Sequence, residues 1–221
     1  MANATGLVTI DEPLSPAAEA YRTLRMNLQF AALDKRLKSI LVTSPGAGEG
    51  KTTVLANLGI TMAQVETRVL LVDCDLRKPQ LHAFFGLTNE RGLTTMLLEE
   101  EAFAHPPIQE TSIPNLRLLA SGALPPRPAD LLGSQRMEKA LARLEAEADI
   151  LLFDAPPLMA AADAVVLATK VDAVLLVVSA GQTKREQTQR ALERLAKVNA
   201  HIIGAVLNNA PLEDIVQGYY R

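Results

Sequence analysis

The chain is poor in several of the features by which classes of protein are recognised. Cys74 is its single cysteine, so an internal disulfide is excluded and we expect a reducing, cytoplasmic compartment. No apolar run approaches the roughly 18 residues of a transmembrane helix, and the N-terminus lacks the basic and apolar regions of a signal peptide. Three scattered histidines and one cysteine leave no spacing suited to zinc ligands.

Charge and length exclude further classes. The formal net charge is −3, so the chain lacks the basic footprint of a nucleic-acid-binding protein, and we expect no nucleic-acid partner. Its 221 residues suffice for one sizeable α/β domain and are few for two. The sequence contains no internal repeat and no Ser-His-Asp pattern.

One glycine-rich stretch organises the chain: residues 44–53 read Ser-Pro-Gly-Ala-Gly-Glu-Gly-Lys-Thr-Thr. An apolar run at 39–43 predicts a buried strand before it, and residues 54–63 predict a helix after it. Strand, glycine loop, Gly-Lys-Thr and helix together form the context of a phosphate-binding loop, which disfavours a chance lysine in a glycine-rich turn. The strict pattern requires glycine where this chain has Pro45, so the loop belongs to a variant class.

The chemistry of such a loop assigns roles to its residues. Backbone N–H groups of a glycine-rich turn and of a helix N-terminus can point at phosphate oxygens. Lys51 can reach the β- and γ-phosphates of a nucleotide, and the Thr52 hydroxyl can ligate Mg²⁺. The expected nucleotide-binding residues of the loop are Gly46, Ala47, Gly48, Glu49, Gly50, Lys51, Thr52 and Thr53.

Three aspartates follow predicted buried strands. Asp73 and Asp75 end the apolar run that begins at Val69, and Asp154 ends the run that begins at Ile150. Since ligands collect at the carboxyl ends of strands in a doubly wound sheet, we expect these acids in the crevice of the phosphate loop. A Mg²⁺ ion bound to phosphates takes one or two such carboxylates. The alternative is that the acids cap helices; it is strongest for Asp75 and weakened by all three occurring together.

The remaining pattern predicts one α/β domain of the P-loop NTPase type, with a mostly parallel twisted sheet and helices on both faces. We expect an extended arm over residues 1–14, the domain over 15–210, and a flexible tail over 211–221. The other expected helices span 78–85, 92–101, 134–148, 163–170 and 184–198, and the other strands 116–120, 173–179 and 201–209. The proline-rich residues 123–128 suggest a flexible connection. Asn208 lies at the end of the last strand. Its position is equally compatible with two roles: a contact to the edge of an adenine base, or a turn residue.

The first predicted helix, over residues 15–32, has two faces. Ser15 and Pro16 suit its N-cap and first turn. The apolar stripe that we expect to dock on the domain consists of Ala20, Leu24, Leu28 and Ala31. Nearly opposite lie Glu19, Arg22 and Arg25. From spacing alone these three form a solvated face with an i,i+3 ion pair.

In their order along the chain, these motifs resemble those of the bacterial tyrosine kinases that regulate capsule and exopolysaccharide synthesis, in their stand-alone cytoplasmic form. The E-x-x-R-x-x-R spacing of residues 19–25 is similar to the family's oligomerisation motif, and residues 44–53 are similar to its variant Walker A. Residues 69–77 resemble its second nucleotide motif, three apolar residues and then D-x-D-x-R. Residues 151–157 resemble its Walker B, with alanine where a hydroxyl residue is usual, and Asn208 matches a base-contacting asparagine of related ATPases.

The resemblance implies a protein-tyrosine kinase whose cofactors are ATP and Mg²⁺. Lys51 would stabilise the transferred phosphoryl group, and the metal would be held by Thr52, Asp75 and Asp154. The family pattern favours Asp73 as the base that accepts the tyrosine proton. From the sequence, the choice between Asp73 and Asp75 stays open.

The resemblance also implies partners. Residues 15–36 would be an oligomerisation helix that builds a ring-like homo-oligomer; an octamer is one candidate, and the sequence leaves the ring size open. Its contact residues would be Glu19, Arg22 and Arg25. Each subunit would autophosphorylate Tyr219 and Tyr220 on the tail of its neighbour, although the family usually carries a longer tyrosine cluster. A separate membrane protein, a chain-length-determining adaptor, would activate the kinase and recruit it to the inner face of the membrane, and a tyrosine phosphatase would reverse the modification.

Two other functions share much of this pattern. A partitioning or positioning ATPase of the same superfamily would carry a second, signature lysine early in the loop, where this chain has Gly46. A nucleotide-dependent scaffold of the polysaccharide machinery would bind ATP without phosphorylating a tyrosine. The short tail and the alanine of the Walker B motif are compatible with the scaffold.

Overall fold

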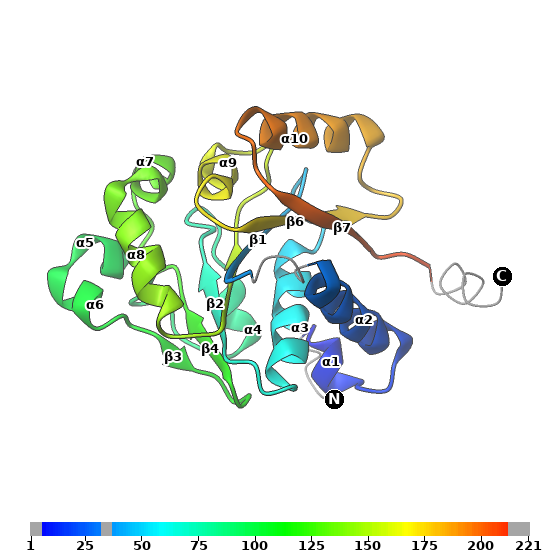
Figure 1. Cartoon of the computed structure of the whole chain (residues 1–221), viewed down its shortest axis with the longest axis horizontal. Coiled ribbons are helices and arrows are strands. Elements are labelled where there is room, and N and C mark those ends of the chain that lie inside the picture. Colours follow the sequence, from blue (N-terminus) through cyan, green and yellow to red (C-terminus); the bar gives the residue numbers. More distant parts are fainter. Residues whose placement is uncertain (1–5, 32–36, 212–221) are drawn as a thin grey trace.

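The computed structural model describes residues 6–31 and 37–211, and a single sheet forms its centre (Figure 1). Within these residues, seven strands pair in the order β3-β4-β2-β5-β1-β6-β7. Neighbouring strands are parallel except for β3 and β4, which run antiparallel. The strands are β1 (Ser39–Thr43), β2 (Val69–Asp73), β3 (Gln109–Glu110), β4 (Leu116–Leu119), β5 (Ile150–Asp154), β6 (Ala173–Ser179) and β7 (Ile202–Asn208). The predicted fold class is confirmed.

The central strands consist of unbroken apolar runs. β1 and β2 are buried along their whole length and β5 nearly so, as strands covered on both faces must be. The register aligns Asp73 of β2 with Asp154 of β5, and Asp154 with Val42 of β1. Two acidic strand ends therefore lie side by side, next to the strand from which the glycine-rich loop departs.

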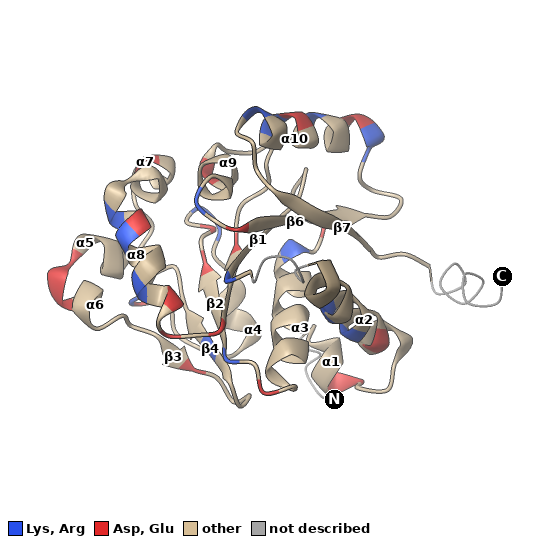
Figure 2. Cartoon of the chain, viewed as in Figure 1, with Lys and Arg blue, Asp and Glu red and all other residues tan. Residues whose placement is uncertain are grey.

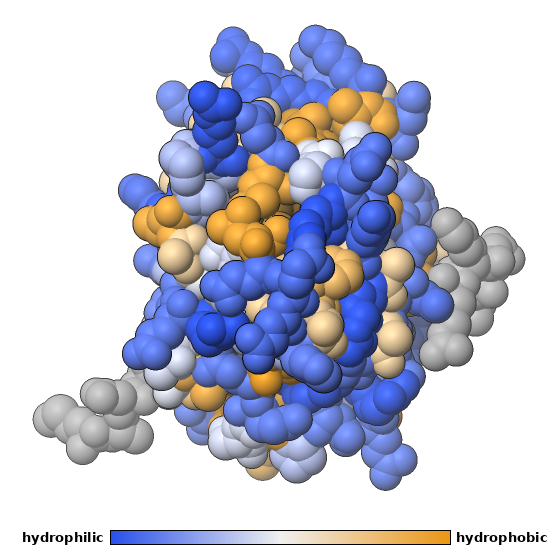
Figure 3. Space-filling model, turned by 90° about the vertical axis from the view of Figure 1, so that its left-hand side faces the viewer, coloured by the Kyte–Doolittle hydropathy of each residue, from blue (hydrophilic) through white to orange (hydrophobic). Residues whose placement is uncertain are grey.

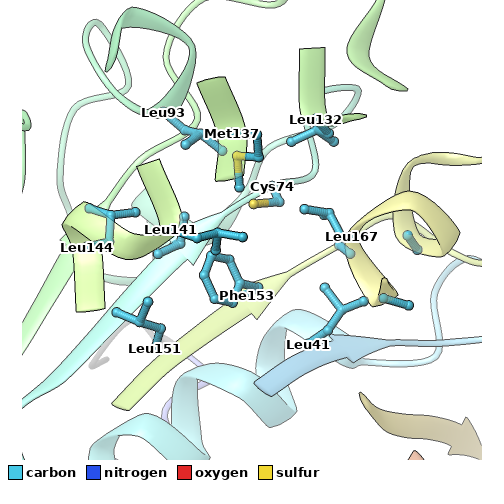
Figure 4. Packing of buried hydrophobic residues seen from close by; sticks show 14 of the residues in the cluster. Leu41, Cys74, Leu93, Leu132, Met137, Leu141, Leu144, Leu151, Phe153 and Leu167 are labelled. Carbon is cyan, nitrogen blue, oxygen red and sulfur yellow. The ribbon is translucent and has the colours of Figure 1, made fainter. Parts of the chain in front are cut away.

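Each face of the sheet carries its own layer of helices, because successive side chains of a strand point to opposite faces. One layer consists of α5 (Leu93–Leu98), α6 (Glu100–Ala104), α7 (Pro128–Gly133), α8 (Gln135–Glu145), α9 (Asp163–Ala168) and α10 (Arg185–Lys197). Its helices pack Met137, Leu141 and Leu167 against Phe153 and Leu41 of the sheet (Figure 4). The opposite layer consists of α2 (Pro16–Ala31), α3 (Lys51–Ala63) and α4 (Leu81–Phe84), and buries the other side chains of the same strands.

Most predicted elements are present, with differences that have local causes. Residues 92–101 form two helices rather than one, because Glu99 adopts an extended backbone (φ −112°, ψ 134°) between α5 and α6. α4 begins at Leu81, later than predicted, because the Asp73 carboxylate binds the Leu81 N–H and shapes the preceding turn. The sequence did not indicate β3 or α7. In α7 the last proline of the proline-rich connection, Pro128, is a buried first-turn residue.

The N-terminal segment is not an extended arm, and that prediction is wrong for the described residues. Val8–Asp11 form a short helix, α1, and Leu7 is buried. The fully buried Asn57 of α3 accepts hydrogen bonds from Thr9 N (3.1 Å) and Thr9 Oγ1 (2.9 Å), and it donates to the Gly6 carbonyl (3.0 Å). One buried amide thus fastens the segment to α3.

The predicted first helix is α2, but the face that docks is only partly the predicted one. Ala20 and Ala31 are exposed, contrary to prediction, whereas Leu24 is partly buried as predicted. The docked face runs through Ala18, Tyr21, Leu24 and Leu28. The larger side chains determine the docking, since they remove more apolar area from water than an alanine methyl group.

The outer surface varies from element to element. Charges of both signs alternate along α10 (Figure 2). Viewed from the side of α5 to α8, the molecule shows a cluster of apolar atoms among hydrophilic ones (Figure 3), and Leu98 and Leu124 are exposed large apolar residues of this part of the chain. Across the described residues, no helix is both long and apolar enough to cross a lipid bilayer.

Candidate active site

The glycine-rich loop makes a tight turn between β1 and α3. Gly48 (φ +76°) and Gly50 (φ +85°) adopt the left-handed backbone that favours glycine. A Cβ on Gly50 would also lie only 2.1 Å from Asn208 Nδ2. Lys51 is the first residue of α3, so the loop leads directly into a helix N-terminus. Backbone N–H groups without a Cβ in front of them form the cradle that phosphate oxygens require.

Three other residues of the predicted nucleotide-binding set have backbone carbonyls that contact side chains. The Ser44 hydroxyl donates to the Gly46 carbonyl (2.7 Å), and Gln182 Nε2 lies 3.5 Å from the Ala47 carbonyl. The Thr53 carbonyl accepts a hydrogen bond from Asn57 Nδ2 (2.9 Å). The loop is therefore held by the side chains of its own first residue, of α3 and of the segment between β6 and α10.

Lys51 joins the loop to the acidic strand ends. Its Nζ lies 3.1 Å from Asp75 Oδ2, 3.2 Å from Asp154 Oδ1 and 3.3 Å from Thr52 Oγ1. The side chain is 13% exposed. Burial alone would lower the pKa of Lys51, but the carboxylates of Asp154 and Asp75 outweigh it and raise the pKa above its usual value. The lysine is thus a fully charged ammonium group between two carboxylates.

Asp154 is the most deeply enclosed of the predicted acids that meet the lysine. Its Oδ2 accepts a 2.6 Å hydrogen bond from Thr52 Oγ1 while Oδ1 faces Lys51, and its side chain is 1% exposed. Burial raises its pKa, although the lysine and the threonine hydroxyl act in the opposite direction.

The structure separates Asp73 from Asp75. Asp75 turns toward Lys51, but Asp73 is fully buried, and its two carboxylate oxygens accept the backbone N–H groups of Asp75 (3.1 Å) and Leu81 (3.1 Å). Burial, together with the nearby charge of Asp154, raises the pKa of Asp73 to about 8. The two acids therefore do not share one open crevice, contrary to what their period-two spacing predicts.

The donor set fits a magnesium ion. Thr52, Asp75 and Asp154 offer hard oxygen atoms, the ligand type that Mg²⁺ takes, and the Lys51 ammonium already occupies a position between them as a cation. Among the described residues, no group of three or more His, Cys, Asp or Glu side chains could hold a metal by itself. Such a site is completed by the oxygen atoms of a bound nucleotide.

Asn208 contacts the loop rather than only ending a strand. Its Nδ2 donates to the Glu49 carbonyl at 3.0 Å. The Glu49 carboxylate is buried and accepts from Thr183 Oγ1 (2.8 Å), and this hydroxyl in turn accepts from Ser179 N (2.7 Å). The ends of β6 and β7 are therefore bonded to the phosphate loop. The sequence predicted Asn208 as a candidate nucleotide-binding residue, but it did not indicate Thr183.

The charged residues of α2 form the ion pair that their spacing predicts and two contacts that it does not. Arg22 Nη1 lies 2.8 Å from Glu19 Oε2, which confirms the i,i+3 ion pair. Arg22 Nη2 also donates to the Pro13 carbonyl (2.5 Å), and Arg25 Nη1 donates to Gln29 Oε1 (3.2 Å). The two predicted phosphorylation sites, Tyr219 and Tyr220, lie outside the residues that the structure describes.

The sequence did not indicate one ion pair near the site. Arg77, two residues beyond Asp75, forms a two-pronged ion pair with Asp163 at the start of α9, and Asp163 is fully buried. The D-x-D-x-R motif contains the arginine, but its partner is 86 residues away. The sequence indicated Asp163 only as a helix start.

Comparison with known proteins identifies the family. The family model described as an AAA domain matches residues 37–208. Tyrosine-protein kinase YwqD of Bacillus subtilis (strain 168) is 40% identical over 97% of this chain and 90% of its own length. The putative tyrosine-protein kinase CapB of Staphylococcus aureus is 32% identical over 95% of this chain and 92% of its own.

A solved structure agrees with these relatives. The kinase domain of the Escherichia coli tyrosine kinase ETK superposes with a TM-score of 0.86 and 31% identity, over 92% of this chain and 80% of that one. The sequence and the fold are thus similar to those of tyrosine kinases over more than nine-tenths of this chain. The protein therefore belongs to the bacterial tyrosine-protein kinases, and it is a nucleotide-binding protein-tyrosine kinase of the P-loop fold.

Proposed function

We propose that this kinase autophosphorylates Tyr219 and Tyr220 in trans, within a ring-like homo-oligomer, and thereby regulates the synthesis and export of capsular or extracellular polysaccharide. The observation that carries the proposal is the position of Lys51, whose Nζ lies 3.1 Å from Asp75 and 3.2 Å from Asp154 at the mouth of the phosphate loop. A lysine, a hydroxyl and two strand-end carboxylates in this arrangement suit phosphoryl transfer, in which catalysis is mainly positioning and charge stabilisation.

The residues of the loop would divide the work of binding MgATP. Residues 46–53 surround the phosphates with backbone N–H groups, and Lys51 moves from the carboxylates to the β- and γ-phosphate oxygens. Thr52, Asp75 and Asp154 hold Mg²⁺, which neutralises charge on the phosphates when bound. The Asn208 amide would read the base; its hydrogen bond to the Glu49 carbonyl, which brings it beside the loop, supports this role.

Asp73 would accept the proton of the attacking tyrosine. A phenol has a pKa near 10, so transfer at neutral pH needs a base within hydrogen-bond reach. The pKa of Asp73, raised to about 8, suits a proton acceptor better than that of an ordinary carboxylate. Because its oxygen atoms bind the N–H groups of Asp75 and Leu81, the tyrosine reaches it only after this turn shifts.

Helix α2 would build the ring. It carries the charged motif of Glu19, Arg22 and Arg25, and it also exposes two large apolar side chains, Met26 (46%) and Phe30 (63%). Apolar groups exposed beside charged ones are typical of contact surfaces between proteins. Each phosphotyrosine adds roughly −1.5 to −2 charges at pH 7, which would loosen the docking of a tail in the neighbouring site. A membrane adaptor would activate the ring at the inner membrane face, and a phosphatase would reset it.

Mass spectrometry of the purified protein incubated with MgATP tests the proposal, with and without the adaptor's cytoplasmic segment. We expect phosphate on Tyr219 or Tyr220, and none in a variant in which both are phenylalanine. ATP turnover with an unphosphorylated tail would favour the partitioning or positioning ATPase. Nucleotide binding without turnover or phosphotyrosine would favour the scaffold.

A further inference from the structure

The ion pair between Arg77 and Asp163 links two segments that each carry a candidate metal ligand. Arg77 Nε lies 2.8 Å from Asp163 Oδ2, and Arg77 Nη2 lies 3.0 Å from Asp163 Oδ1. The arginine belongs to the turn after β2, which contains Asp75. The aspartate begins α9, which follows the segment that leaves β5 at Asp154.

The conformation of the turn after β2 determines where Asp75 points. Asp75 Oδ1 accepts the backbone N–H of Lys78 (3.0 Å) and lies 3.4 Å from that of Arg77. This leaves Oδ2 for Lys51 Nζ at 3.1 Å. A shift of the turn would therefore move the carboxylate that meets the lysine.

The segment that carries Asp163 is itself bonded to the start of the phosphate loop. The Leu158 N–H donates to the Ser44 carbonyl (2.8 Å), and the Met159 N–H donates to the Pro45 carbonyl (3.2 Å). Asp163 is thus held in a fixed position relative to the loop. Because Arg77 is paired with Asp163, the turn that contains Asp75 is held in place relative to the loop as well.

We propose that Asp163 and Arg77 are positioning residues. Their ion pair holds the turn that contains Asp75 in a fixed position relative to the phosphate loop, and it thereby sets the affinity of the site for Mg²⁺-nucleotide. The inference rests on the proposed metal-binding role of Asp75. Neither residue touches the reacting atoms, and both act through the direction of the Asp75 carboxylate.

The burial of the pair argues against a role in stability alone. Arg77 is 46% exposed, and ion pairs of exposed groups contribute little to stability. Asp163 is fully buried, and desolvation of a carboxylate opposes folding unless its geometry is excellent. Two parallel hydrogen bonds to the rigid, planar guanidinium group of Arg77 supply that geometry. They also fix the orientation of the two side chains relative to each other, which a single hydrogen bond would not do.

The chain contains a matched control at the opposite ends of the same two strands. Arg68 precedes β2 and Asp149 precedes β5, and they form the same two-pronged pair, Nη2–Oδ1 2.8 Å and Nε–Oδ2 3.2 Å. This pair joins the residues that precede the two strands, at the end of the sheet away from the loop. Its loss should change stability without changing the affinity for Mg²⁺-nucleotide.

The test compares Asp163→Asn, Arg77→Lys, their double variant and Asp149→Asn. For each variant we would measure the melting temperature, the Mg²⁺ concentration that gives half-maximal binding of ADP, and kcat and KM for ATP in tyrosine phosphorylation. Arg77→Lys keeps a positive charge beside Asp163, so it provides a folded variant if Asp163→Asn is unstable.

Loss of a supporting residue around a metal typically weakens affinity or activity about tenfold or more. We therefore expect the half-saturating Mg²⁺ concentration and the KM for ATP to rise about tenfold in each single variant, with a smaller change in kcat. The double variant should resemble the single ones, because the two residues act as one unit. Asp149→Asn should match the wild type in Mg²⁺ requirement.

Two results would overturn the proposal: a wild-type Mg²⁺ requirement in Asp163→Asn or Arg77→Lys, or effects that multiply in the double variant. A wild-type protein that binds ADP without Mg²⁺ dependence, or forms no phosphotyrosine, would instead remove the proposed function on which the inference rests. The two failures are therefore distinguishable.

Discussion

Replacing Lys51 with methionine should destabilise the nucleotide-free protein as well as abolish catalysis. The lysine ammonium is the positive charge that contacts both Asp75 and Asp154, whose side chains are 7% and 1% exposed. Methionine has a similar length but no charge, so the two carboxylates would face each other without compensation. One of them must then take up a proton or the site must open.

The size of the effect follows from the burial of the pair. Removing one partner of a buried ion pair costs about 3–5 kcal/mol, and because water partly reaches Lys51 we expect the lower end, about 3 kcal/mol. For a protein of this size each kcal/mol shifts the melting temperature by roughly 2–4 °C, so the expected decrease is roughly 6–12 °C.

The loss should also depend on pH. The pKa of Asp154 is already raised by burial and would rise further without the lysine. Its unfolded value is about 3.9, so the folded variant binds more protons than the unfolded chain above that pH. Its stability therefore falls as pH rises. The difference from the wild type should be smaller at pH 5 than at pH 8.

Urea denaturation at the two pH values measures this difference, with phosphotyrosine formation measured in parallel. Lys51→Arg is the control, because it keeps the positive charge and should retain most of the stability while losing activity. A methionine variant as stable as the wild type at pH 8, or equally destabilised at both pH values, would refute the reasoning.

Three further predictions concern the surroundings of the site. Gly50→Ala should abolish ADP binding measured by calorimetry, because a Cβ at this position would lie 2.1 Å from Asn208 Nδ2. Adding Asn208→Ala removes this clash, but the left-handed backbone of residue 50 still costs about 1–2 kcal/mol with an alanine. Asn57→Ala should lower the free energy of unfolding by about 2–4 kcal/mol in urea denaturation, because Thr9 loses its buried acceptor; unchanged stability would contradict this. Arg22→Ala should convert the proposed ring-like oligomer to monomers in light scattering at nearly unchanged melting temperature, since its exposed pair with Glu19 contributes only about 0.2–0.5 kcal/mol.

The sheet could be predicted from the sequence because its strands are buried on both faces. β1 and β6 were predicted with the bounds that the structure has, since an uninterrupted apolar run between polar residues defines a central parallel strand. The short helices could not be predicted equally well. The break at Glu99 and the late start of α4 result from the local backbone and from side-chain hydrogen bonds, and neither leaves a periodic signal.

The site residues that lie in local sequence motifs were predicted, and those that reach the site through contacts between distant segments were missed. Gly-Lys-Thr and the strand-end aspartates could be found because their positions follow from the order of strand, loop and helix. Thr183 meets Glu49 across 134 residues, and Asp163 meets Arg77 across 86. Neither Thr183 nor Asp163 belongs to a motif that marks it. Only the folded chain brings these residues to the loop.

The different environments of Asp73 and Asp75 explain why the sequence left the base undecided. Period-two spacing places two residues on one face only while the strand continues, but β2 ends at Asp73. The chain turns after Asp73. The Asp73 carboxylate therefore accepts hydrogen bonds from backbone N–H groups of the turn, whereas the Asp75 carboxylate points toward Lys51. One acid thereby organises the turn that positions the other. Comparing Asp73→Asn with Asp75→Asn would consequently require structural and kinetic measurements together, because the first substitution disturbs both residues.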